Sequence, residues 1–362
     1  MLETYRKKLT EHSKITALND SHSYRTPRYC GLTVHFATGG CPYRCSYCYI
    51  YDMGFGYRAR PYPLNPEELV FAILNNKNFV SGRYGTLIAV GSVTEPFLFE
   101  DTAIGFLEEL SKLGNPIQFS TKKYLNHSLA NKISELPTSI SALVSITTID
   151  NVDVLEPYAP SVDKRLGTIY NLSSAGVSTC LFLRPIIVGV NDSEIPKIID
   201  LAIEHGARCV VIGSFRITYH IYTRLKKLGV NLDKIEARIN VKALRKRPKT
   251  QYVVPLKRKE KARIIRVIRN KGAIPFLSAC CANSYSASVI CPSICFETNY
   301  CTSCPNDCRH AERPEVSDVL DSLRILGLDV NVVEKKGKLF VDRGDLIHLI
   351  RVLSRRLTYP AS

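Results

Sequence analysis

Short runs of β-branched and apolar residues alternate, over the first 215 residues or so, with longer stretches whose apolar positions recur every three or four residues. The first pattern predicts buried strands and the second predicts amphipathic helices. We expect strands at residues 31–37, 86–91, 117–120, 142–147, 178–183 and 208–213. We expect helices at residues 65–75, 102–113, 128–136, 161–175 and 192–205. Strands and helices alternating in this order predict an α/β protein with a partial (β/α)6 barrel of the TIM type.

These patterns divide the chain into five parts. Residues 1–28 are polar and predict an N-terminal extension, whereas residues 29–235 carry the partial barrel. We expect a basic linker and helix at residues 236–275, with an amphipathic helix at 257–269, and a cysteine-rich metal site at residues 276–312. We expect a small α/β appendage at residues 313–362, with helices at 316–326 and 346–357 and strands at 330–333 and 337–341. In β/α barrels ligands bind where the strands end, so the residues that follow each strand are the candidates for chemistry.

Three cysteines follow the first strand on one short loop. Cys41 and Cys45 are separated by three residues, and Cys45 and Cys48 by two. Thiolates suit Fe–S clusters, and such short spacers allow one loop to supply three ligands of a [4Fe–4S] cube. The fourth iron is then open to a small molecule. A zinc site or buried thiols are the alternatives, although this spacing is unusual for zinc and no fourth ligand lies nearby.

Residues suited to holding a cofactor follow the later strands. Hydroxyls and carboxylates can accept hydrogen bonds from an ammonium group, and Lys or Arg can pair with a carboxylate. Taken singly, a Ser or Thr at a strand end is more often a helix cap. Together, and in order behind the cysteine loop, they predict a binding site. On this ground the cofactor-binding candidates are Ser92, Thr94, Glu95, Ser120, Lys122, Ser145 and Thr147.

The cysteine loop, with aromatic Tyr47 before its last cysteine, resembles the CxxxCxΦC signature of the radical S-adenosylmethionine (SAM) enzymes. The resemblance implies that Cys41, Cys45 and Cys48 hold a [4Fe–4S] cluster whose open iron binds SAM. It also implies an electron donor such as ferredoxin or flavodoxin, and cleavage of SAM to a 5′-deoxyadenosyl radical that takes hydrogen from a substrate. Glu95 would bind the methionine amino group of SAM, and Lys122 its carboxylate. Residues 183–192 resemble the superfamily's GxIxGxxE-like element, which packs along the adenine. The resemblance thereby adds Arg184, as a contact of the SAM carboxylate or ribose, and Gly189 to the cofactor-binding candidates.

A finer resemblance covers residues 30–214 and is to the spore photoproduct lyase-like branch, whose members include DNA repair photolyase-related proteins. It is carried by Gly-Ser-Val-Thr-Glu-Pro at residues 91–96, Ser-Thr-Lys-Lys at 120–123 and Leu-Arg-Pro-Ile at 183–186, among others. The branch places Glu156 and Arg165 over the active site. Without the resemblance, we would expect a Pro-rich turn there, with Arg165 solvated.

The chain departs from this branch in one respect that concerns the reaction. Spore photoproduct lyases are thought to return a hydrogen atom from a cysteine between the cluster motif and the later strands, but this chain has no cysteine between Cys48 and Cys180. Cys180, a tyrosine or a C-terminal cysteine would have to replace it. The sequence therefore identifies no catalytic residue.

The charge of the chain suggests a polyanionic partner. The 362 residues have a net charge of +16, and residues 242–271 hold thirteen Lys or Arg against the single acidic Glu260. Such a stretch suits nucleic acid, and a solvated helix is the alternative. No stretch approaches the ~20 apolar residues that a membrane span requires, and no export signal is recognisable. We expect a cytoplasmic protein with no membrane partner.

A second group of cysteines lies near the C-terminus, where seven occur within 29 residues. They predict an auxiliary [4Fe–4S] cluster, with a structural zinc site as the competing hypothesis. The candidate ligands are Cys291, Cys295, Cys301, Cys304 and Cys308, with Cys280 and Cys281 before them and His310 beyond. Cys30 and Cys209 lie inside apolar strands, and we expect them to be buried bystanders.

Together these features predict a radical SAM enzyme that acts on nucleic acid, by DNA repair-like chemistry or RNA modification. One alternative is a peptide- or metabolite-modifying radical SAM enzyme, because auxiliary clusters are common in that group. Another is a non-catalytic nucleic-acid-binding protein in which the metal sites are structural; it would not cleave SAM.

Overall fold

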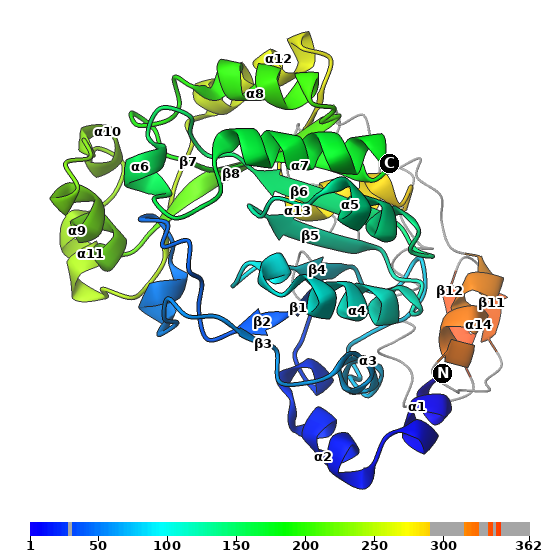
Figure 1. Ribbon diagram of the computed structural model, residues 1–362. Coiled ribbons are helices and arrows are strands. Elements are labelled where there is room, and N and C mark those ends of the chain that lie inside the picture. The colour runs from blue at the N-terminus through cyan, green and yellow to red at the C-terminus, as the bar shows by residue number, and fades with distance from the viewer. Residues whose placement is uncertain (28–30, 290–314, 326–331, 336–337, 342–362) are drawn as a thin grey trace.

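A mostly parallel sheet forms the centre of the protein (Figure 1). The computed structural model describes residues 1–27, 31–289, 315–325, 332–335 and 338–341. The eight-stranded sheet has the order β1-β4-β5-β6-β7-β8-β10, in which all neighbours are parallel, and β9 pairs antiparallel with β8. Its strands are β1 (Leu32–Val34), β4 (Ile88–Val90), β5 (Ile117–Thr121), β6 (Ile140–Ser145), β7 (Ser178–Ile186), β8 (Cys209–Ile217), β9 (Tyr252–Val254) and β10 (Ile274–Phe276). The predicted α/β class and parallel arrangement are confirmed.

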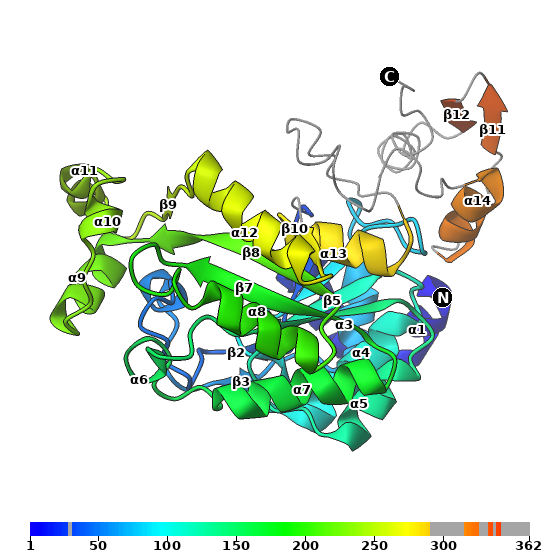
Figure 2. The same ribbon diagram turned by 90° about the horizontal axis from the view of Figure 1, so that it is seen from above.

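Helices connect the strands and cover the sheet. The five predicted helices correspond to α3 (Pro66–Leu74), α4 (Glu100–Ser111), α5 (His127–Ser134), α7 (Val162–Ser174) and α8 (Ile195–Glu204). Helix α3 begins at a capping box, in which the Asn65 side chain accepts from the Glu68 amide and the Glu68 carboxylate accepts from the Asn65 amide. Figure 2 shows α7 and α8 on one face of the sheet and α13 (Ala279–Ser286) on the opposite side. Strand β6 is therefore buried along its whole length.

The prediction of six strands missed β10. This strand has three residues, one of which is Pro275, so it lacks the length and the alternation that reveal a strand in sequence. It pairs in parallel with β8 at the edge of the sheet, where a missing amide is tolerated. The basic stretch before it contains α12 (Arg258–Asn270), whose Ile264, Ile265 and Ile268 are buried. The predicted amphipathic helix is thus confirmed.

Further elements lie outside the predicted barrel. The N-terminal extension forms α1 (Leu2–Lys8) and α2 (Glu11–Asn19), and residues 37–61 add the short strands β2 (Ala37–Thr38) and β3 (Arg60–Pro61) around a 3-10 turn, η2 (Ile50–Met53). A short helix α6 (Val152–Leu155) precedes α7. After β8 the chain forms α9 (Tyr219–Lys227), α10 (Asp233–Glu236) and α11 (Val241–Lys246).

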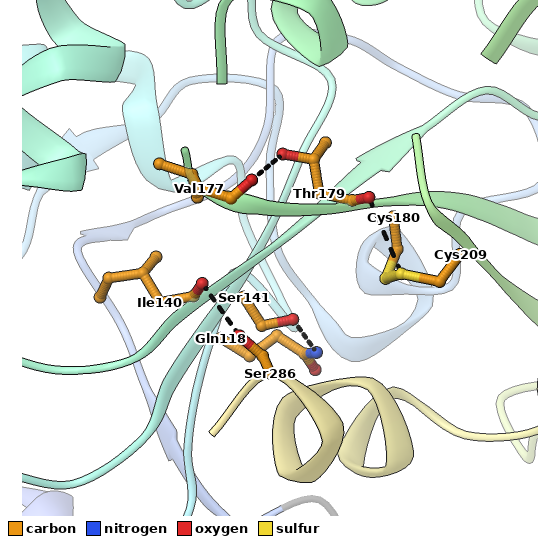
Figure 3. Close-up of a disulfide and its surroundings, with 8 residues drawn as sticks. All are labelled: Gln118, Ile140, Ser141, Val177, Thr179, Cys180, Cys209 and Ser286. Carbon is orange, nitrogen blue, oxygen red and sulfur yellow. Dashed lines mark hydrogen bonds between the residues drawn. A yellow bond between two sulfur atoms is a disulfide. The ribbon is translucent and has the colours of Figure 1, made fainter. Parts of the chain in front are cut away.

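A disulfide joins two neighbouring strands (Figure 3). Cys180 of β7 and Cys209 of β8 are opposite each other in the strand register and are both buried. Cys209 is buried as expected, but the prediction that it is a bystander is wrong, because two buried neighbours in register are close enough to bond. Cys180 is consequently not a free thiol in this structure, and the idea that it donates hydrogen is not supported.

The C-terminal appendage is described in part. Helix α14 (Val316–Ile325) and the hairpin of β11 (Val332–Lys335) and β12 (Lys338–Val341) lie where the sequence predicts a helix and two strands. Helix α14 contacts the barrel where the Ser81 hydroxyl donates to the Ser322 carbonyl, 3.0 Å away. The predicted last helix, at residues 346–357, lies outside the described residues. Among the residues that are described, no helix has the length and apolar character needed to cross a membrane.

Candidate active site

The three-cysteine loop, residues 41–48, is held on both sides. Its start requires glycine: Gly40 has a φ of +153°, and a Cβ there would lie 1.8 Å from the Gly56 carbonyl oxygen. The Cys41 amide donates to that same oxygen over 3.1 Å. On the other side, the Arg224 guanidinium of α9 donates to the carbonyl of Ser46 over 3.0 Å. The loop therefore presents its thiols from a fixed backbone.

The loop closes over a cavity of about 340 Å³ at the carboxyl ends of the strands. All three cysteines line it, and none of them is in a disulfide. Seven of the nine cofactor-binding candidates line the same cavity: Ser92, Thr94, Glu95, Ser120, Lys122, Ser145 and Arg184. The fold therefore brings together, from four strand ends, groups that are up to 92 positions apart in sequence.

Polar groups at the ends of β4 and β5 form an edge rich in acceptors. The Thr94 hydroxyl donates to the Ala37 carbonyl and the Ser120 hydroxyl donates to the Gly91 carbonyl, each over 3.0 Å. Because a hydroxyl has only one hydrogen, these two can only accept from a ligand while those bonds persist. An edge of this kind suits an ammonium group better than a carboxylate.

Glu95 is buried at this edge and held in one orientation. Its carboxylate accepts hydrogen bonds from the Thr121 hydroxyl (2.5 Å) and from the amides of Lys122 (2.9 Å) and Phe97 (3.4 Å). Burial raises the pKa of Glu95 even though these bonds favour the charged form. A cationic ligand group in the cavity would offset that cost of burial.

A buried charge network, formed by Tyr47, Lys122, Glu156 and Arg165, lies behind the loop. The Glu156 carboxylate accepts from the Arg165 guanidinium over 2.5 Å and also from the Tyr47 hydroxyl, and it lies 3.6 Å from the Lys122 ammonium. Burial alone would raise the pKa of Glu156, but the two cations lower it overall. Conversely, burial disfavours the charged lysine, but Glu156 raises its pKa above the ordinary value.

Sequence reasoning without the family resemblance missed this network. It predicts Arg165 in solvent, whereas the side chain is fully buried and donates to the carbonyls of Pro160 (2.8 Å) and Ser145 (3.2 Å). A fixed spacing of nine residues between an acidic and a basic residue, on either side of a Pro-rich turn, is the only sequence signal. Lys122 therefore does not face the cavity as an isolated cation, because Glu156, which also pairs with Arg165, partly offsets its charge.

Two candidates do not line the cavity. Thr147 is buried behind it, where its hydroxyl lies 3.1 Å from the Tyr47 hydroxyl and donates to the Arg184 carbonyl over 3.1 Å. Gly189 forms the turn after β7 with a φ of +88°, and its amide donates to the Asp192 carboxylate over 2.5 Å. Thr147 thus positions the aromatic of the loop and the backbone of Arg184, and Gly189 shapes the turn that follows.

Burial and nearby groups act in opposite directions on the thiols of the loop. Burial raises the pKa of Cys41 to about 11, while the nearby Lys122 opposes that rise. Among the described residues, no three Cys, His, Asp or Glu side chains come together closely enough to bind one metal ion. A [4Fe–4S] cube takes each cysteine on a different iron, so its ligands need not converge on one point.

The second group of cysteines is only partly described. Cys291, Cys295, Cys301, Cys304 and Cys308, and also Cys30, lie outside the described residues. Cys280 and Cys281 belong to α13, and Cys281 packs against the cluster that contains the Cys180–Cys209 disulfide. The Cys280 sulfur lies 3.0 Å from the Ser278 hydroxyl.

The fold and the cavity define a β/α protein of the partial-barrel class, whose ligand site lies at the carboxyl ends of its strands. Residues 36–202 match the Radical SAM superfamily. The chain therefore contains a radical SAM domain, and the match includes the three-cysteine loop and all the cofactor-binding candidates.

Solved structures share this fold. A spore photoproduct lyase mutant superposes with a TM-score of 0.53 and 16% identity, over 70% of this chain and 79% of that one. A second mutant of the lyase, with bound AdoMet and dinucleoside spore photoproduct, gives 0.55 and 15%, over 75% and 86%. A third, with dinucleoside spore photoproduct, gives 0.52 and 17%, over 67% and 75%. At such identities the similarity establishes the fold alone. A search of curated proteins found no significant match.

Proposed function

We propose that this protein is a radical SAM enzyme that acts on nucleic acid. The observation that carries the proposal is the shared cavity, in which three thiols from one loop meet an acceptor-rich edge and three cationic side chains. The match of residues 36–202 to the Radical SAM superfamily supports it independently.

Cys41, Cys45 and Cys48 would hold a [4Fe–4S] cluster, and SAM would occupy the rest of the cavity. When bound and reduced, these two cofactors supply a 5′-deoxyadenosyl radical for hydrogen abstraction. Glu95, with Ser92 and Thr94, would accept hydrogen bonds from the amino group of SAM, because this edge is rich in acceptors.

The cationic side chains Arg184 and Lys122 would both contact SAM. Arg184 lines the cavity at the end of β7 and would pair with the carboxylate or ribose of SAM. Lys122 shares Glu156 with Arg165, so these three groups keep one net positive charge, which a SAM carboxylate would offset. Tyr43 and Tyr47 are buried and line the cavity, where they exclude water from the reacting groups.

Nucleic acid is the proposed substrate class because of charge. The net charge of +16 and the basic stretch at residues 242–271 suit a polyanion. Two of the lyase structures that share the fold contain a dinucleoside photoproduct, a ligand of that protein. We further propose that a protein such as ferredoxin or flavodoxin donates the electron, and that the five cysteines at 291–308 hold an auxiliary cluster.

The cofactor assignment can be tested by spectroscopy. Protein reconstituted anaerobically with iron and sulfide should show, after reduction, an electron paramagnetic resonance signal that changes when SAM is added, because SAM would bind an iron. The C41A/C45A/C48A variant should lose the SAM-sensitive signal. An unchanged signal in the variant would refute the assignment of the loop.

The same pair of samples tests the auxiliary site. Residual iron and sulfide in the triple variant would establish a second cluster, whereas zinc without sulfide would indicate a structural metal site. Such residual iron would also be the expected result for the alternative, a peptide-modifying enzyme, so it does not by itself decide the substrate.

A further inference from the structure

The segment between β8 and β9 lies next to the cavity. Strand β8 ends at Ile217, and β9 returns antiparallel to it, so that Arg216 pairs in register with Val253. Arg216 is exposed and lines the cavity, and its guanidinium donates to the Gln251 side chain over 3.4 Å. Figure 1 shows the intervening helices α9, α10 and α11 as one group at the end of the sheet.

This segment has a fixed position. The Tyr219 amide, just after β8, donates to the Pro248 carbonyl over 3.1 Å. Leu244 of α11 is buried in an apolar cluster that also contains Tyr43 and Cys45 of the three-cysteine loop. The surface of α11 and the residues that follow it is therefore held at a set distance from the proposed cluster site.

Its basic side chains are not neutralised. Five cations within eight residues are exposed, and none forms an ion pair with a residue in the described parts of the chain: Lys242, Arg245, Lys246, Arg247 and Lys249. Four other basic residues nearby are neutralised by carboxylates, in the pairs Arg224–Asp52, Lys226–Glu236, Arg238–Glu260 and Lys271–Asp200. Residues 242–249 thus carry five exposed positive charges that no carboxylate of the described residues offsets.

We propose that residues 242–249 bind the phosphodiester backbone of the nucleic-acid substrate and that Arg216 continues this contact into the cavity. The inference rests on the proposed function and names the surface that would bind the nucleic-acid substrate. Arg216 connects the basic segment to the inside of the cavity, where a substrate nucleotide has to enter. An acidic electron-donor protein would instead need only the outer face of the three-cysteine loop.

Helix α12 provides a matched control, since it was the basic helix favoured by sequence alone. Its Arg263, Arg266 and Arg269 are also exposed. However, α12 packs its apolar side into the main core, and its last turn leads to Lys271, which pairs with Asp200 of α8. Helix α12 runs from β9, which pairs with the carboxyl end of β8, towards β10, which pairs with the amino end of β8. Successive arginines on it therefore lie further from the strand ends that form the cavity.

Binding of labelled single-stranded DNA should be measured by fluorescence anisotropy between 50 and 200 mM salt, a range over which phosphate binding weakens strongly. The variant K246Q/R247Q/K249Q should bind about tenfold more weakly or worse, and the slope of log K against log salt should fall in magnitude by about 2, or ~0.7 for each phosphate that is no longer neutralised. The variant R263Q/R266Q/R269Q removes the same charge and should change affinity less than about threefold.

Each other outcome is informative. Equal weakening by both variants would show a general charge effect and overturn the assignment of this surface while nucleic-acid binding stands. Unchanged DNA binding, together with slower flavodoxin-driven turnover, would assign residues 242–249 to an acidic electron donor and also overturn it. A wild-type protein that binds neither DNA nor RNA would overturn the inference and the proposed substrate class together. The urea unfolding midpoints of both variants should equal that of the wild type, which excludes misfolding as the cause of weaker binding.

Discussion

Replacing Glu156 with Gln should destabilise the protein strongly although the two side chains have nearly the same shape. Glu156 and Arg165 are fully buried, and the substitution removes the anion that balances both Arg165 and Lys122. Removing one partner of a buried ion pair typically costs about 3–5 kcal/mol, because the other charge remains buried without compensation. Since the free energy of unfolding typically falls by ~1–3 kcal/mol per molar urea, the urea concentration at the unfolding midpoint should fall by on the order of 1 M or more.

The double variant E156Q/R165M sharpens this test. Methionine removes one of the uncompensated cations and also the Arg165 Nη2 group, which has no hydrogen-bond partner among the described residues. The double variant should therefore lose less free energy of unfolding than the sum of the losses in E156Q and R165M, by about 1.5 kcal/mol or more. E3Q, which weakens an exposed pair with Arg6, serves as the control and should leave the midpoint unchanged. Additive effects, or an E156Q midpoint equal to the wild type, would refute the buried network.

Three further predictions address other parts of the molecule. G40A should prevent iron loading, because its Cβ would lie 1.8 Å from the Gly56 carbonyl oxygen; a fully loaded G40A protein would show that the loop can rearrange. Burial lowers the pKa of His35 to about 3, so the unfolded state binds a proton below about pH 6.5 that the folded state does not, and the unfolding free energy should fall as pH drops from 6.5 towards 3. The non-titrating variant H35Q should show a smaller fall, and an identical pH profile would contradict the assignment. Reduction of the Cys180–Cys209 disulfide should lower the free energy of unfolding by about 3.6 kcal/mol, as expected for a sequence separation of 29; a midpoint that does not respond to reductant would indicate that the bond does not contribute.

Local patterns were sufficient to predict most of the barrel. Buried parallel strands read as continuous apolar runs, and residues such as Asn65 mark helix starts by their own hydrogen bonds. Strand β10 could not be predicted in the same way, because Ile274–Phe276 is short and becomes a strand only by pairing with β8. The Cys180–Cys209 disulfide depends likewise on strand register, which sequence spacing does not reveal.

The candidate site was also predictable only in part, because some of its contacts depend on the tertiary fold. The order of polar residues after the strands, together with the family resemblance, selected seven that line one cavity, because the carboxyl ends of parallel strands meet at one edge. Thr147 illustrates the difficulty, since the strand before it ends at Ser145 and the intervening turn directs its hydroxyl to Tyr47 and the Arg184 carbonyl. The partners of Glu156 and Arg165 come from distant parts of the chain, so their burial follows only from the tertiary fold.

Formation of 5′-deoxyadenosine from SAM is the most direct measure of the proposed chemistry. Wild-type protein, reconstituted anaerobically and reduced with dithionite, should produce it, and C41A/C45A/C48A prepared in parallel should produce none. The assay should include wild-type samples with and without single-stranded DNA or RNA, so that cleavage requiring bound substrate is also detected. If fully loaded wild-type protein forms no 5′-deoxyadenosine under any of these conditions, or if the triple variant forms as much as the wild type, the proposed radical SAM activity is contradicted.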